Sequence, residues 1–509
     1  MKKYISIADA LTLLAMLFFV LDLGYRVDRQ GFTHLIFDYA ALFLLYFHVL
    51  YKVKKESNDI QIRDTFKIFR TYTPTQFWLF GGVILRGCLL FSEPNLSEDI
   101  YRFIWDGRLI HLGINPFDFK PSYYFDNQLF TDTLTPELYA KLNSENYFSV
   151  YPSACQGVFA FSVWLFPKSV FGAMVITKFF LLACEVGSIY LLYKMIPTSA
   201  HLSKSFELLE RYVPRHSNIL IYVLNPLIII ELCGNAHFEA AMIFFFLLAI
   251  FLLKSTTEQY SVVSHDNQRN SVQLHFFSSA FAFALSVASK MLPLMLLPLM
   301  VRYLGWKKSM AYGSLVAISL ILLFYPLYND LFIDNIRTSL NLYFQKFEFN
   351  ASVYYMYSYI EMAKWGFNPI ITISRNLNIV VVTSIMILTF FSKKGGNTEG
   401  VSQKGIFGYS LSDKPIAVGL FFEKALFILS VYFLCAAIVH PWYASFLLVL
   451  SVFTSYRYLV VWTFLLPLTY IHYAYSQPAE NFWVIGFEYV IVLIFFIFEK
   501  YVMLKKLRR

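Results

Sequence analysis

The residues with the clearest chemical potential gather in one polar segment, residues 97–116, SEDIYRFIWDGRLIHLGINP. Asp99, Arg102 and Asp106 stand at positions i, i+3 and i+7, a spacing that places them on one face of a helix. A carboxylate there can act as a general base towards a hydroxyl group. An arginine beside it can bind a phosphate through two parallel hydrogen bonds. The pattern therefore indicates chemistry on a hydroxyl and a phosphate.

The same segment also has purely structural interpretations. Ser97 can cap the helix and Gly113 can end it, which places Glu98 and Asp99 in the first turn, where acids complement the helix dipole. Arg102 can form an ion pair with a neighbouring aspartate, because charges near a membrane boundary usually pair. The sequence leaves both interpretations open.

The elements that must position this segment are membrane-spanning helices. Of the 509 residues, 58% are hydrophobic, too many for the core of a soluble protein of this length. They form runs of roughly 13 to 18 residues, which with their flanks approach the ~20 needed to cross a bilayer. We predict an all-α polytopic membrane protein with about 14 transmembrane helices and a single domain over residues 1–509. The clearest runs are residues 11–23, 37–51, 240–253, 314–327, 379–391 and 482–498.

The distribution of charge orients these helices. Basic residues concentrate in cytoplasmic loops of membrane proteins, whereas residues 92–153 hold only four basic residues against nine acidic ones. Residues 92–153 therefore form a large first external loop with short helices and the presumed active site, and residues 329–368 form a second external loop. The net charge of +9 reflects basic cytoplasmic clusters, not nucleic-acid binding. These clusters are Lys2-Lys3, residues 52–70, 194–215, 307–308, Lys393-Lys394 and residues 500–509.

Two further observations limit the fold. Residues 154–192 are long enough for two helices, but the charge pattern requires one net crossing, so one helix should be re-entrant or interfacial. The five cysteines lie in or beside apolar runs without a CxxC pair, which indicates neither disulfides nor zinc.

Motifs in order along the chain resemble those of the GT-C glycosyltransferases. The resemblance is greatest to bacterial polyprenol-phosphate-mannose-type mannosyltransferases, with a more distant likeness to the eukaryotic GPI mannosyltransferase I. Two positions differ from that family's GNGHxD pattern, because Ala236 replaces a glycine and Glu239 replaces an aspartate. The matching segments are Glu98–Arg102, Trp105–Arg108, Gly113–Phe117, Tyr151-Pro152, Asn225-Pro226, Gly234–Glu239, Lys290, Phe349–Ser352 and His440–Tyr443.

The resemblance implies transfer of a hexose, which we predict to be mannose, from a polyprenyl-phosphate-sugar donor to an acceptor hydroxyl of a glycolipid or glycan. It implies inversion at the anomeric carbon, Asp99 as the catalytic base and Glu98 as the reserve candidate. A divalent cation, Mg²⁺ or Mn²⁺, can be accommodated near these two acids, but we assign no metal ligand. Candidates for contact with the donor phosphate or sugar are Arg102, Asp106, Arg108, His237, Glu239, Lys290, His440, Trp442 and Tyr443.

Most of these candidates have simpler interpretations as well. His237 can be a solvated histidine in a turn, and Glu239 can cap the following helix. Lys290, at the end of a span, can extend its ammonium group to the membrane surface. Trp442 and Tyr443 fit an aromatic belt as readily as a platform for a sugar.

The main alternative function is a lipid or solute transporter, or flippase. Transporters often show internal repeats and broken helices that meet near the midplane, but here no repeat is evident and the polar motifs gather on one face. An inactive accessory protein, a polymer ligase and an oligosaccharyltransferase-like protein are further alternatives. The short loops and the family resemblance point to a bacterial inner membrane, with the active site on the periplasmic side.

Overall fold

The computed structural model describes residues 6–61, 74–196, 216–259, 266–345, 347–391, 414–475 and 479–507. Over these residues the chain is helical, and its only β-type pairing is a bridge between Phe349 and Ile438. The all-α prediction is confirmed. The basic clusters at Lys2-Lys3 and Lys393-Lys394, and residues 197–215 of the cluster at 194–215, lie outside the described residues, as do 62–73 and 508–509.

Six described helices are long and apolar enough to cross a membrane. A bent pair, His216–Val223 with Pro226–Gly234, forms a seventh candidate span with an angle of 51°. The predicted number of about 14 transmembrane helices is not confirmed, because several apolar helices are short. The six spans lie in α1 (Ile7–Tyr25), α2 (Phe32–Gln61), α8 (Val170–Met195), α14 (Trp306–Phe324), α17 (Ile370–Met386) and α21 (Phe482–Leu507).

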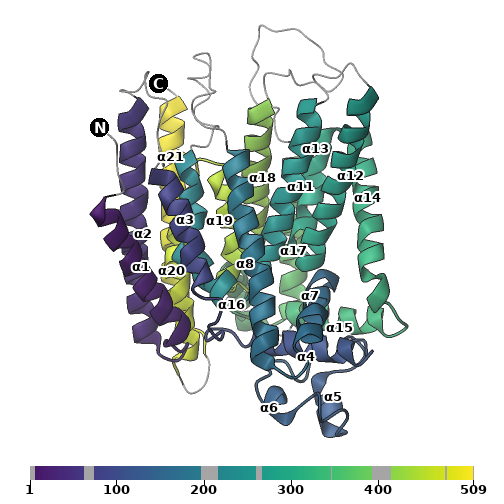
Figure 1. Cartoon of the computed structure of the whole chain (residues 1–509). Helices are drawn as coiled ribbons and strands as arrows, with labels where there is room; N and C mark the ends of the chain where they lie inside the picture. Colours follow the sequence, from purple (N-terminus) through teal and green to yellow (C-terminus); the bar gives the residue numbers. More distant parts are fainter. Residues whose placement is uncertain are drawn as a thin grey trace.

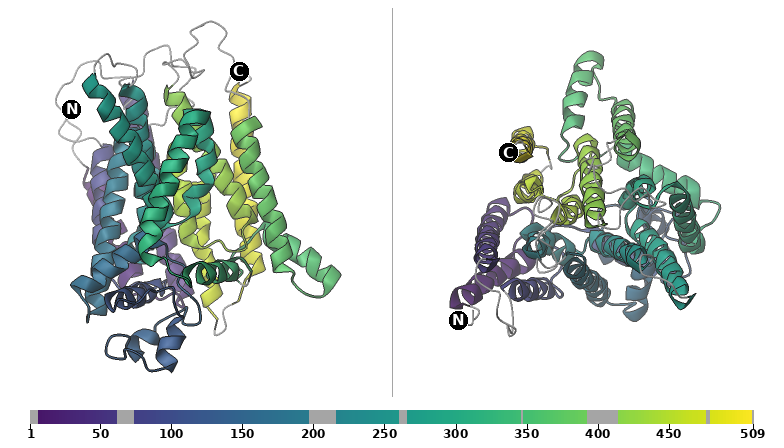
Figure 2. Two further views of the ribbon diagram at one scale, coloured as in Figure 1. Left: turned by 90° about the vertical axis from the view of Figure 1, so that its right-hand side faces the viewer. Right: turned by 90° about the horizontal axis from the view of Figure 1, so that it is seen from above.

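The bundle brings the two ends of the chain together. Figure 2 shows the purple N-terminal helices beside the yellow C-terminal ones. α2 packs against α20 (Tyr458–Leu465), where the rings of Phe43 and Phe464 meet at 5.2 Å. Residues from both ends of the sequence can therefore contribute to one site.

The stretch 154–192 contains two helices of unequal length. α7 (Ser153–Leu165) has 13 residues and is roughly 20 Å long, shorter than the ~30 Å hydrocarbon core. α8, with 26 residues, is long enough to span. α7 packs against α4 and α8, and one net crossing in this stretch stays a prediction.

Residues 92–153, the predicted first external loop, include a group of short helices at one end of the bundle, the lower end in Figure 1. These are α4 (Asp99–His111), α5 (Pro121–Asp126) and α6 (Pro136–Tyr139). The predicted cap is wrong by one residue, because Glu98 occupies the N-cap position and the Ser97 hydroxyl accepts a 3.4 Å bond from the Asp99 amide. Gly113 follows α4 with φ +76°, as expected for a helix end.

The predicted second external loop, residues 329–368, lies against the predicted first one. It contains α15 (Phe332–Gln345) and α16 (Val353–Trp365). The Asn329 amide donates to Asp118 at 2.6 Å, and the Asn335 amide donates to the Phe117 carbonyl at 2.8 Å. These bonds fix the two loops to each other.

A broken helical segment lies in the protein interior. It comprises α9 (Leu220–Val223), α10 (Pro226–Ile228) and the π-helical turn η4 (Ile229–Gly234), and all of its side chains are buried. Irregular backbone at membrane depth is tolerated where protein covers it. This segment leads into residues 235–239, which belong to the site below.

Candidate active site

Asp99 begins α4 and keeps part of its carboxylate accessible. Its side chain is 22% exposed, and the Asn143 amide donates to Oδ1 at 3.1 Å. The other oxygen, Oδ2, lies 4.0 Å from Nδ1 of His237, which is longer than a hydrogen bond. The first turn of α4 stabilises negative charge at this position. The structure therefore presents a carboxylate with free acceptor capacity beside a histidine from another element.

Glu98 is held more firmly than its neighbour. Its Oε1 lies 2.5 Å from the guanidinium of Arg29, in the turn between α1 and α2. The same guanidinium lies 4.7 Å from the ring centroid of Tyr473. Sequence reasoning missed both partners, because Arg29 stands 69 residues from Glu98 in a turn without a motif.

His237 is buried, so it is not the solvated turn histidine that the sequence allowed. Its ring stacks on Trp442 with centroids 3.8 Å apart, and Trp442 stacks on His440 at 4.4 Å. The predicted site residues of two distant motifs thus form one aromatic stack. Trp442 lies in the short 3₁₀ turn η9 (Pro441–Tyr443), and His440 immediately precedes this turn.

His440 is a neutral member of this stack. Desolvation by the surrounding protein is the largest cause that lowers the pKa of His440, and together with His237, Lys290 and His472, against the opposing effect of Asp99, it brings this pKa to about 3. His440 is therefore uncharged near pH 7. It can stack or share a hydrogen bond, but it cannot supply positive charge to a phosphate.

The turn that carries His440 is anchored to the second external loop. The Phe349 amide donates to the Ala437 carbonyl at 2.9 Å, and the Val439 amide donates to the Phe349 carbonyl at 2.8 Å. The Phe349 ring also lies 4.8 Å from that of His440. Asn350, which follows, is buried and donates to Glu488 at 3.2 Å.

Lys290 and Glu239 form an ion pair beside the stack. Their charged atoms lie 3.2 Å apart, with 26% of the lysine and 3% of the glutamate side chain exposed. The Lys290 ammonium group also lies 5.9 Å from the ring centroid of Tyr443. Glu239 is the first residue of α11 (Glu239–Gln259), so it occupies the capping turn and pairs with a cation as well.

Glu231 is a buried acid that sequence reasoning missed. Its Oε1 accepts a 2.7 Å bond from the Tyr470 hydroxyl, and its Oε2 accepts a 3.1 Å bond from the Asn235 amide. Oε2 also lies 3.4 Å from Nε2 of His237, without the alignment of a hydrogen bond. The sequence feature that could have identified Glu231 is its position inside the apolar run NPLIIIELCGN, where an ionisable residue is costly unless it has a role.

The turn before His237 requires an unusual backbone conformation. Ala236 is fully buried and has φ +61°, in the left-handed region that glycine adopts most easily. This explains why the resembling family has glycine at this position. Alanine carries a strain of about 1–2 kcal/mol there.

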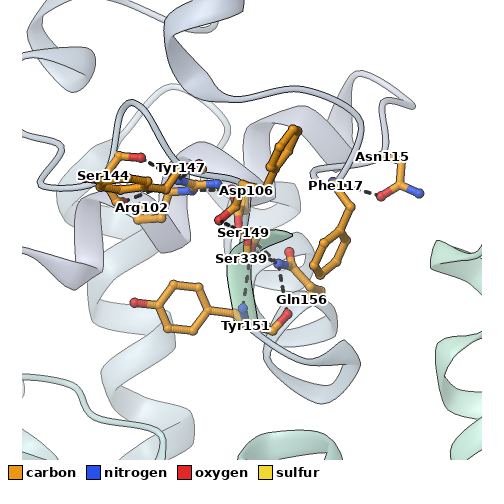
Figure 3. Close-up of polar contacts among 11 residues, drawn as sticks. Arg102, Asp106, Asn115, Phe117, Ser144, Tyr147, Ser149, Tyr151, Gln156 and Ser339 are labelled. Carbon is orange, nitrogen blue, oxygen red and sulfur yellow. Dashed lines mark hydrogen bonds and ion pairs between the residues drawn. The ribbon is translucent and has the colours of Figure 1, made fainter. Parts of the chain in front are cut away.

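Arg102 and Asp106 pair with each other and not with Asp99 (Figure 3). The Arg102 Nε lies 2.8 Å from Asp106 Oδ1, and both side chains are buried. Asp106 Oδ2 accepts from Ser149 at 2.5 Å and from Gln156 at 3.0 Å. The Arg102 Nη1 donates at 2.9 Å to each of two backbone carbonyls, those of Ser144 and Tyr147. This network fixes the end of the first external loop on α4.

Arg108 is used elsewhere in the same loop. Its side chain is buried, Nη1 donates to the Thr133 carbonyl at 2.7 Å, and desolvation lowers the pKa of Arg108. Within the described part of the chain, no hydrogen bond or ion pair joins Arg102, Asp106 or Arg108 to Asp99 or His237. The structure thus separates these three candidates from the group around Asp99.

Comparison with known proteins agrees with the motifs. Residues 87–305 match the model of the MptA/B family, described as alpha-(1->6)-mannopyranosyltransferase, N-terminal domain. The match includes Asp99, His237 and Lys290, and it confirms the resemblance to mannosyltransferases of the GT-C type. Searches of curated proteins and of solved structures give no match.

Proposed function

Since residues 87–305 match a mannosyltransferase domain, we propose that this chain transfers mannose from a polyprenyl-phosphate-mannose donor to an acceptor hydroxyl of a glycolipid or glycan. The reaction takes place at the α4 end of the bundle. The charge distribution supports a position of this end on the outer, periplasmic side of a bacterial inner membrane.

One observation carries the proposal: a partly exposed Asp99 carboxylate lies where three separate segments meet. These segments are the start of α4, the turn at His237 and the turn at Trp442. All three contain motifs of the resembling family. Their convergence supports a single site, and a partly exposed carboxylate supports proton transfer there.

The proposed mechanism is a single displacement. Asp99 accepts the proton of the acceptor hydroxyl as its oxygen bonds to the anomeric carbon from the face opposite the phosphate. The bond between the anomeric carbon and the phosphate oxygen breaks, and polyprenyl phosphate leaves with the electron pair. The configuration inverts, and no covalent enzyme intermediate forms.

Positive groups near Asp99 stabilise the leaving phosphate, because negative charge collects on it in the transition state. The candidates are Lys290 and Arg29. Lys290 pairs with Glu239, and Arg29 pairs with Glu98. The donor phosphate displaces these carboxylates or shares the two cations with them. An Mg²⁺ or Mn²⁺ ion at Glu98 and Asp99 is not part of the proposal, because Arg29 already compensates the charge of Glu98.

The proposal is tested by turnover of defined donors. Purified protein in liposomes is given polyprenyl-phosphate-linked mannose, glucose or galactose together with a membrane lipid extract, and released polyprenyl phosphate is measured. We expect release with the mannose donor and an inverted linkage in the product. Transport of lipid or solute across the liposomes without release from any donor would contradict the proposal and favour a transporter.

A further inference from the structure

A second cluster of ligand-type side chains lies in the α1–α2 hairpin, separate from Asp99. Asp22 stands in the last turn of α1, and His34 and Asp38 stand in the first two turns of α2. One atom from each, a carboxylate oxygen or an imidazole nitrogen, lies within 4.8 Å of the other two. The His34 Nε2 is 2.8 Å from Asp22 Oδ2 and 3.5 Å from Asp38 Oδ2.

Asp38 has an unsatisfied oxygen that faces this cluster. Its side chain is 2% exposed, and its buried Oδ2 has no hydrogen-bond partner among the described residues. Asp22 is 10% exposed, and its second oxygen lies 3.4 Å from Arg26, whose side chain is largely in solvent. A buried carboxylate oxygen without a partner is costly, so two carboxylates this close call for a shared positive charge.

We propose that Asp22, His34 and Asp38 bind one divalent cation of the Zn²⁺ or Mn²⁺ type. Ligand bonds of roughly 2.0–2.2 Å separate neighbouring ligand atoms by about 3.0–3.5 Å, near the two distances from His34. Two carboxylates with one imidazole suit zinc or manganese better than calcium or magnesium, which take oxygen ligands. The His34 side chain is 53% exposed, so water can complete the coordination.

The ion would fix the hairpin turn that carries Arg29. The Asn95 amide donates to the Leu23 carbonyl at 2.7 Å, which ties the approach to α4 to the end of α1. Arg29, in the same turn, holds Glu98. An ion that links Asp22 of α1 to His34 and Asp38 of α2 therefore holds Arg29, and through it Glu98, in place beside Asp99. The ion itself does not contact the substrate. This consequence rests on the proposed function, whereas the metal site does not.

The site is tested by metal binding without any donor or acceptor. Full-length protein in detergent micelles is stripped with EDTA and titrated with MnCl₂, and free Mn²⁺ is followed by electron paramagnetic resonance. We expect one Mn²⁺ per chain, displaced by ZnCl₂. His34→Gln should lower the affinity at least about tenfold. His48→Gln, an exposed histidine of the same helix, is the matched control and should bind as the unchanged protein does.

A second measurement, the thermal unfolding temperature, distinguishes a loss of metal binding from misfolding of a variant. ZnCl₂ should raise the thermal unfolding temperature of the unchanged protein and of His48→Gln, but not that of His34→Gln or Asp38→Asn. Absence of stoichiometric Mn²⁺ or Zn²⁺ binding would overturn the proposal. Equal affinity in His34→Gln and His48→Gln would overturn it as well, because the ion would then bind elsewhere. Neither outcome bears on mannosyl transfer.

Discussion

Replacing Arg102 with methionine should destabilise the first external loop without weakening donor binding in the protein that remains folded. The Arg102 and Asp106 side chains are 2% and 0% exposed and lie 2.8 Å apart. Without the guanidinium, Asp106 keeps only the neutral donors Ser149 and Gln156. Two backbone carbonyls of the loop lose their donor as well.

The magnitude follows from burial. Removing one partner of a buried ion pair costs about 3–5 kcal/mol, because the remaining charge is uncompensated. Asp106→Asn keeps the volume and one acceptor oxygen, so it should cost less, about 1–3 kcal/mol. The double variant should cost at least about 1 kcal/mol less than the sum of the single changes, because it leaves no buried charge unpaired.

Chemical unfolding in micelles measures these free energies. Trp105, fully buried in α4 and next to the pair, provides a fluorescence signal for the loop. Lys141→Met, which removes an exposed cation of the same loop, is the control. The KM for the donor is measured in parallel on folded protein. An unchanged unfolding midpoint with a KM raised about tenfold would refute the structural assignment and favour phosphate binding.

Three further changes test other parts of the structure. Gly107→Ala should destabilise the protein by about 1–3 kcal/mol in the same unfolding assay, since its Cβ would lie 2.5 Å from the Phe159 carbonyl oxygen of α7; equal stability would show that this contact can relax. Ala236→Gly should stabilise by up to about 1 kcal/mol through relief of left-handed strain, and a loss of stability would contradict that account. His440 has a pKa of about 3, below its usual 6.5, so its contribution to stability is complete above pH 6.5 and is lost as pH falls towards 3. His440→Phe should therefore show a smaller loss of unfolding free energy between pH 7 and pH 4 than the unchanged protein, and an equal loss would refute the assignment.

The long helices could be predicted because apolar runs of membrane length have few alternative structures. Each of the six runs lies in a helix, including residues 379–391, which end in the π-helical turn η7 (Ile387–Phe391). The number of spans could not be fixed in this way. Short helices such as α7 are apolar without having the length of a span, and the broken segment before His237 reaches that length only if its two bent parts count as one span.

The site was predictable only where a motif marks it. The motifs led to Asp99, His237, Trp442 and Lys290, which the fold brings together from four regions. No local sequence pattern marks Arg29, because its contact with Glu98 forms only when the fold places the start of α4 beside the turn between α1 and α2.

Helical spacing also left the partner of Arg102 undecided. The i, i+3, i+7 pattern placed it on one face with both Asp99 and Asp106, and the structure pairs it with Asp106 at i+4. Burial settles the difference, since Asp106 is fully enclosed by the loop, whereas Asp99 keeps access to solvent. Sequence spacing does not report burial.

The most direct test of the central claim is the turnover number of Asp99→Asn with the polyprenyl-phosphate-mannose donor. A general base contributes about 10²–10⁴-fold, so kcat should fall by that factor while the protein keeps its unfolding midpoint. Asp132→Asn, an exposed acid of the same loop, serves as the control and should retain full turnover. Turnover of Asp99→Asn within about twofold of the unchanged protein would contradict the assignment of Asp99 as the base.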